Sequence, residues 1–282
     1  MSIKYKSLII SISALLFSLA IFHPTLAHAK NLSQIKAEEL MEESGLNLAI
    51  KSTENQINAS LILERKNNPE KAFSHNEQEL FTRELKESNF RINITEAIQQ
   101  QLDRTEIEYL INYFNSDLIK RSLTEDNALT APNQQKQQQL FFDELSSNPL
   151  SLSRTKLIED LEKASLATHA AAYNMITMQK ARIKASMQFD NSFDKEAELK
   201  LNAYINKLKL DVEPRLRQQK IHLMKYVYRN FSDNELSLLI KLLNDKKRVK
   251  YFILVTDAFA NTLSSGISKG LTAVLQHRKN NK

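Results

Sequence analysis

Residues 154–187 read RTKLIEDLEKASLATHAAAYNMITMQKARIKASM, a stretch without glycine or proline. Small and apolar residues recur along it at the three- and four-residue spacing of one helix face: Leu157, Leu161, Ala164, Thr168, Ala171, Met175 and Met178. Five alanines between residues 164 and 172 leave room for a neighbouring helix to approach closely. The pattern predicts a helical segment over the whole stretch.

The composition of the whole chain also favours helices. Its 282 residues include 3 glycines, 5 prolines and no cysteine, and 42% of them are hydrophobic. Tight hairpins and phosphate-binding loops need glycine where φ is positive or where the backbone approaches a ligand. The scarcity of glycine therefore disfavours all-β, Rossmann and P-loop folds. We predict an all-α fold, in a chain long enough to bury a core without disulfides.

The first 29 residues have the pattern of a signal peptide. Lys4 and Lys6 precede an apolar stretch from Leu8 to Phe22, and Ala27-His28-Ala29 places small residues where signal peptidase reads them. The apolar stretch is shorter than the ~20 residues of a membrane-spanning helix, and an uncleaved N-terminal anchor is the alternative. We expect cleavage after Ala29, a periplasmic or secreted location, and no transmembrane segment in the mature chain.

A Gln-rich stretch bracketed by Pro132 and Pro149 divides the mature chain. We predict a first helical unit over residues 30–130, a linker over 131–150 and a second helical unit over 151–282, with a loop inside one domain as the alternative to a linker. Up to residue 150 the mature chain carries 13 basic and 20 acidic residues, and beyond it 24 and 13. Such asymmetry is typical of an acidic and a basic face that meet, or of a basic surface for an anionic partner.

Two capping boxes lie 129 residues apart. Asp103 and Glu106 form the first, and Ser232 and Glu235 form the second. Each box has an apolar residue before it and another after its glutamate, which is the pattern of a hydrophobic staple, and similar apolar stripes follow. We interpret the match as two related helical repeats, the first acidic and the second basic.

Two landmarks of the sequence resemble a known family. Residues 37–46, AEELMEESGL, follow the expected signal peptide, and residues 231–236, FSDNEL, lead into a helix that ends at Leu243. Both are similar to the uncharacterised bacterial envelope family called domain of unknown function two-zero-five-nine, in two divergent copies. Residues 244–247 read NDKK where that family has a Ser-Pro-Gly-like turn. The resemblance implies an all-helical exported protein of Gram-negative bacteria, and it supplies no reaction, cofactor or catalytic residue.

Sequence motifs of known chemistry are missing. The chain has no cysteine, no His-Glu-x-x-His and no Gly-x-Ser-x-Gly motif. His75 and Glu79 are one helical turn apart, but two ligands make a weak metal site, and an exposed helix pair explains them equally well. We therefore predict no catalytic residue, no cofactor and no metal site.

The densest basic run is a candidate contact patch, made of Lys246, Lys247, Arg248 and Lys250. Such a run can contact phosphate or anionic lipid, although a solvated helix start has the same pattern. Basic and aromatic residues do not interleave as in a nucleic-acid groove, so nucleic acid is not expected as a partner.

These observations favour a non-enzymatic helical protein of the cell envelope that binds a protein or peptide partner, as a binding or adaptor module. Contact with anionic lipid or a cell-wall polymer through the basic second half is the first alternative. An enzyme with a site assembled from scattered Glu, His and Tyr residues is the second.

Overall fold

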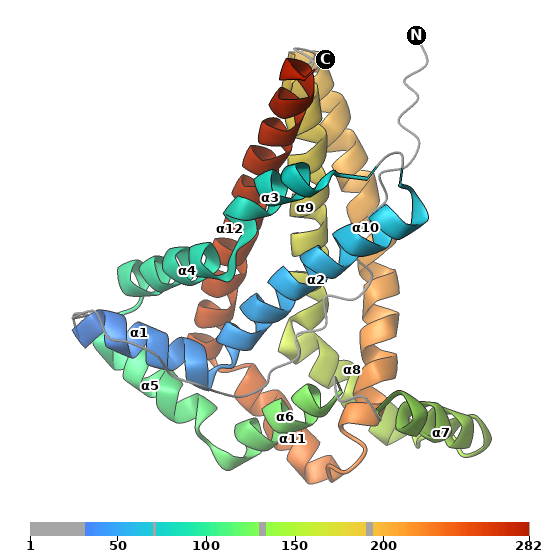
Figure 1. Ribbon diagram of the computed structural model, residues 1–282. Coiled ribbons are helices and arrows are strands. Elements are labelled where there is room, and N and C mark those ends of the chain that lie inside the picture. The colour runs from blue at the N-terminus through green and yellow to red at the C-terminus, as the bar shows by residue number, and fades with distance from the viewer. Residues whose placement is uncertain (1–31, 70–71, 130–133, 190–193, 282) are drawn as a thin grey trace.

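The computed structural model describes residues 32–69, 72–129, 134–189 and 194–281. These residues form helices α1 to α12 and one 3-10 turn, η1, and no strand occurs among them (Figure 1). The prediction of an all-α fold is therefore confirmed. The expected signal peptide, residues 1–29, lies outside the described residues.

The helices divide into a first half, α1 to α6, and a second half, α8 to α12, with α7 between them. Their bounds are α1 Leu32–Glu43, α2 Leu46–Asn67, α3 His75–Thr82, η1 Arg83–Leu85, α4 Glu87–Gln101, α5 Arg104–Phe114, α6 Asp117–Ala128, α7 Gln134–Ser147, α8 Leu152–Ser165, α9 Ala167–Phe189, α10 Lys195–Val227, α11 Asp233–Leu243 and α12 Lys246–Asn280.

The last helix, α12, contacts both halves. It packs along α9 of the second half and against α3, η1 and α4 of the first half. The ring of Phe259 on α12 lies 4.8 Å from that of Phe90 on α4, and both residues are buried. Farther along, Arg278 Nε lies 2.6 Å from Glu77 Oε1 on α3. The two halves therefore share one hydrophobic core.

Three long helices form one end of the molecule. In Figure 1, α9, α10 and α12 run side by side toward the C-terminus, and α9 contacts each of the other two. The alanines of α9 at 170, 171, 172, 181 and 185 are buried. Small side chains at these positions let the helix axes approach closely.

The predicted helical segment over residues 154–187 is interrupted at one residue. Leu166 has φ 62° and ψ 11°, in the left-handed region, and it separates α8 from α9. A left-handed leucine is unfavourable because its Cβ crowds the backbone. The first half has the same turn at Gly45, with φ 74° and ψ 10°, where glycine adopts it without that penalty.

Both predicted capping boxes are formed. In the first, Glu106 N donates to Asp103 Oδ1 at 2.8 Å, and Asp103 N donates to Glu106 Oε2 at 3.1 Å. In the second, Glu235 N donates to Ser232 Oγ at 3.2 Å, and Ser232 N donates to Glu235 Oε2 at 2.7 Å. The helices that they open, α5 and α11, have 11 residues each.

The two boxes are also joined crosswise. Glu106 of the first half pairs with Lys250 of α12 at 2.7 Å, and Glu235 of the second half pairs with Arg121 of α6 at 2.5 Å. Lys250 follows Arg121 by the same 129 residues that separate the two glutamates. Each box therefore receives its cation from the helix that follows the other box.

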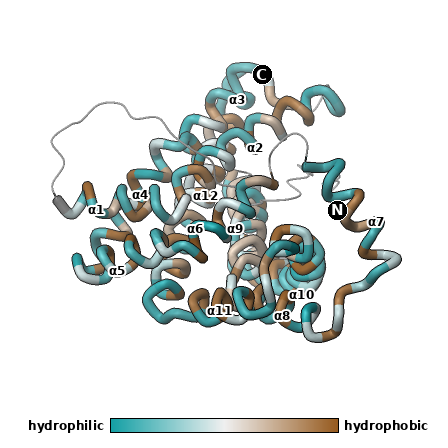
Figure 2. The backbone as a smooth tube through the Cα atoms, turned by 90° about the horizontal axis from the view of Figure 1, so that it is seen from below, coloured by the Kyte–Doolittle hydropathy of each residue, from teal (hydrophilic) through white to brown (hydrophobic). Residues whose placement is uncertain are grey.

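The predicted linker, residues 131–150, contains helix α7, which lies at the edge of the molecule in Figure 2. It docks on α10 through two rings: Phe141 lies 5.4 Å from Tyr226, and Phe142 lies 3.7 Å from His222 in a stacked arrangement. No described residue of α7 is buried. The helix is therefore an addition to the surface of the fold and not part of the shared core.

Apolar and polar residues alternate along the helices in Figure 2, without a long apolar run. Among the described residues, no helix combines the length and hydropathy that crossing a membrane requires.

Gly266 and Gly270, one turn apart on α12, lie where first-half backbone approaches closely. A Cβ on Gly270 would stand 2.4 Å from the carbonyl oxygen of Phe81, and one on Gly266 would stand 2.5 Å from the Leu85 side chain. Glycine spacing of this kind permits such contacts between helices.

Replacing Gly270 with alanine tests this contact. In an exposed helix the change stabilises by about 1 kcal/mol, because alanine is the better helix former. Here we expect destabilisation of about 1–3 kcal/mol, because backbone cannot move aside as a flexible side chain can. Urea unfolding of Gly270→Ala measures the sign, with Ser265→Ala, an exposed site on the same helix, as control. A more stable Gly270→Ala protein would contradict the close approach.

Candidate functional site

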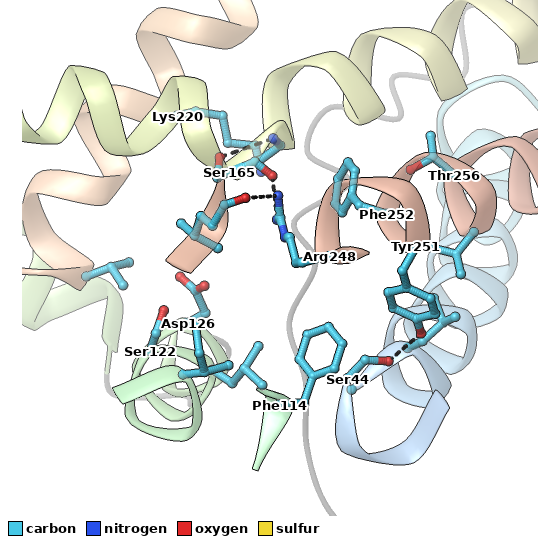
Figure 3. A pocket seen from close by; sticks show the side chains of 18 of the residues that line it. Ser44, Phe114, Ser122, Asp126, Ser165, Lys220, Arg248, Tyr251, Phe252 and Thr256 are labelled. Atoms are coloured by element: carbon cyan, nitrogen blue, oxygen red, sulfur yellow. Dashed lines mark hydrogen bonds between the residues drawn. The ribbon is translucent and has the colours of Figure 1, made fainter. Parts of the chain in front are cut away.

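An internal cavity of about 210 Å³ lies between the two halves. Helices α5 and α6 and the start of α2 form one part of its wall, and α9, α10, α11 and α12 form the rest (Figure 3). The lining is mainly aliphatic and aromatic, with a small number of polar and charged groups. This is the usual character of a ligand site.

Many lining residues occupy corresponding positions in the two halves. From α6 come Ile119, Ser122, Leu123 and Asp126, and from α12 come the residues 129 positions later, Arg248, Tyr251, Phe252 and Val255. Ser44 and Ser165, each just before a left-handed residue, also line the cavity. The cavity is therefore enclosed by equivalent parts of both halves.

Asp126 of α6 is a half-buried carboxylate at the cavity wall. The Tyr228 hydroxyl lies 3.5 Å from its Oδ2 and 3.0 Å from the Ser122 hydroxyl. Burial raises the pKa of Asp126 to about 7, although the charge of Lys220 and the Tyr228 hydroxyl favour ionisation. The carboxyl group therefore exchanges its proton near neutral pH.

Lys220 of α10 brings a cation to the same cavity. Burial lowers its pKa, and the charges of Asp126 and Glu162 oppose that shift. Within the described parts of the chain, its Nζ makes no hydrogen bond or ion pair. Lys220 and Asp126 are thus charges of opposite sign with bonding capacity left for a ligand.

Arg248 corrects the predicted basic patch, because it is buried, with 7% of its surface exposed. Its Nη1 donates to the carbonyl oxygens of Ala164 and Leu243, both at 3.1 Å, and its Nη2 donates to that of Ser165 at 2.8 Å. These carbonyls end helices α8 and α11 and lack partners within their helices. The guanidinium supplies the missing donors.

The lysines of the predicted patch are exposed. Lys250 is paired with Glu106, and Lys247 Nζ lies 4.3 Å from the ring centre of Tyr109. Tyr109 in turn donates to Asp245 Oδ2 at 2.9 Å. The run therefore fastens the start of α12 to α5, and it is not a set of four free cations.

Two polar atoms at the cavity are buried without a hydrogen-bond partner among the described residues. They are Tyr113 Oη and Asn174 Oδ1. Burial raises the pKa of Tyr113 to about 12. A buried polar group left unpaired costs ~1–3 kcal/mol, so a ligand or water that bonds to these atoms gains energy.

The predicted sites of other chemistry lie elsewhere. His75 Nε2 and Glu79 Oε1 are 3.3 Å apart on exposed side chains. The described residues contain no group of three or more His, Cys, Asp or Glu side chains placed to hold a metal ion. Asp126 is the one carboxylate among the described residues that line the cavity, and no histidine is among them.

Sequence reasoning did not select Asp126 or Lys220. The 129-residue correspondence contained a signal for the first, because extending it beyond the capping boxes aligns Asp126 with Val255 on the apolar stripe of α12. Lys220 has no comparable signal, since α10 carries many other lysines and arginines.

Asp126→Asn tests the burial of the carboxylate. The folded pKa of about 7 lies above the unfolded value of ~3.9, so the stability from protonated Asp126 is complete below pH 4 and is lost as the pH rises through 7. Asparagine stays neutral, so we expect the variant to gain about 1–3 kcal/mol over the parent at pH 8 and little at pH 4.

Urea unfolding at both pH values measures this gain, with Glu125→Gln as control because Glu125 does not line the cavity. Equal effects at the two pH values would show that the carboxylate is not desolvated.

The chain matches none of the protein-family models, curated proteins or solved structures with which it was compared.

Proposed function

We propose that this is an exported, non-enzymatic binding protein of the bacterial cell envelope, and that its interior cavity holds a small ligand. The observation that carries the proposal is a cavity with largely apolar walls that also presents unpaired polar groups. Tyr113 and Asn174 have unsatisfied atoms there, and Lys220 has no bonded partner among the described residues.

The energy of an empty cavity supports this proposal. Unfilled space in a core costs about 24 cal/mol per Å³, so about 210 Å³ corresponds to roughly 5 kcal/mol. Whole domains are stable by only ~5–15 kcal/mol. A bound ligand that fills the space and satisfies the polar atoms offsets this penalty.

The lining favours binding over catalysis. General acid–base chemistry commonly uses a histidine or paired carboxylates with separated pKa values. The described lining has one carboxylate and no histidine. Its size suits a small molecule or one side chain of a peptide, so the predicted peptide partner and adaptor role remain compatible with it.

Internal ion pairs favour contact between the two halves over the anionic-lipid alternative. Three cations of α12 pair with glutamates of the first half: Lys250 with Glu106 at 2.7 Å, Lys269 with Glu84 at 3.6 Å and Arg278 with Glu77 at 2.6 Å. Part of the basic charge of the second half is therefore used within the molecule. We also propose that the halves are related repeats, which the matching turns, boxes and lining positions support.

A neutral probe tests ligand binding. We expect indole to raise the melting temperature of the full mature chain, because it can replace empty space with apolar contact. Val255→Phe, which fills the cavity, should abolish the shift, whereas Ile253→Phe, on the exposed side of the same helix, should retain it. An absent shift in the parent protein, or an equal shift in Val255→Phe, would contradict a binding cavity.

Export has a separate test. If Ala27-His28-Ala29 is a cleavage site, the intact mass of the protein from a periplasmic extract corresponds to a chain that begins at Lys30. A membrane-bound protein that retains Met1 would instead support the N-terminal anchor.

A further inference from the structure

We propose that the cavity selects a zwitterion of amino-acid size with an apolar or aromatic side chain, its carboxylate facing Lys220 and its ammonium group facing Asp126. This inference rests on the proposed binding function and names the ligand class of the same site.

The charges of the lining lead to this class. Arg248 has three hydrogen bonds to backbone carbonyls, so its guanidinium is already occupied. Asp126 accepts only one long hydrogen bond among the described residues, and Lys220 makes none. The cavity therefore offers a ligand one accepting anion and one donating cation, on α6 and α10.

A ligand of single charge satisfies only one of these groups. An anion that pairs with Lys220 also faces the Asp126 carboxylate, and a cation that pairs with Asp126 also faces the Lys220 ammonium group. Unfavourable pairing of like charges in a partly desolvated site is a common source of specificity. A zwitterion complements both residues at once.

The rest of the wall suits an apolar body. In Figure 3, Asp126 and Lys220 lie to one side of Arg248, and Tyr251 and Phe252 lie to its other side. The ring of Phe114 also lines the cavity. A ligand with its charged end toward α6 and α10 can therefore place an aromatic or aliphatic group among these rings.

The volume sets the size of the ligand. About 210 Å³ is equal to roughly seven water molecules at ~30 Å³ each. That space is far too small for a lipid with its acyl chains or for a folded peptide. It is of the right order for a single amino acid.

Calorimetric titration of the full mature chain tests the charges, with L-phenylalanine as the probe. Two analogues each lack one charge: 3-phenylpropionate has no ammonium group, and phenethylamine has no carboxylate. We expect phenylalanine to bind at least tenfold more tightly than either analogue.

Substitutions then assign each charge to its residue. Asp126→Asn should remove the preference for phenylalanine over 3-phenylpropionate, and Lys220→Met should remove the preference over phenethylamine. Glu125→Gln and Lys225→Met are matched controls, because both residues neighbour the site without lining it, and both preferences should survive in them. If Lys220→Met does not fold, Lys220→Gln keeps a polar end and gives the same comparison.

The outcomes separate this inference from the binding function. Tighter binding of either analogue, or unchanged preferences in Asp126→Asn and Lys220→Met, would overturn the zwitterion. Binding of indole without any binding of phenylalanine would overturn the zwitterion and leave the cavity as a binding site. No binding of indole or of any charged probe would overturn both.

Discussion

A buried guanidinium fixes the relative positions of three helices at the centre of the molecule. Arg248 at the start of α12 binds the last carbonyls of α8 and α11. A charge is stable in a protein interior only when its hydrogen bonds are made, and helix C-termini offer carbonyls with partial negative charge. Because α12 continues from this point through the core of the first half, the placement of Arg248 affects both halves.

Features that depend on neighbouring residues were predictable from the sequence. The boxes at Asp103 and Ser232 need only a glutamate three residues later, and both formed. The break at Leu166 was not predictable, because it depends on a distant residue. A left-handed leucine is tolerated there while Arg248, far along the chain, binds the two carbonyls before it.

The candidate site shows the same limit. Asp126 and Lys220 lie on helices with many other charges, and only the packing of α6 and α10 around one cavity distinguishes them. The predicted run of four cations was divided by helical geometry. Arg248 lies one turn before Tyr251 and Phe252, on the side of α12 that faces the cavity, while the lysines around it point to other sides. Charge density along the sequence could not show that difference, but the apolar spacing of α12 could.

The contact between the last helix and the first half has a consequence for the order of synthesis. Phe90 and Glu77 wait for Phe259 and Arg278, which leave the ribosome nearly two hundred residues later. Folding that depends on such distant contacts is slow, since a long loop must close first. The nascent chain therefore cannot complete its core before translation ends. An unfolded chain of this kind is what a narrow translocation channel can accept.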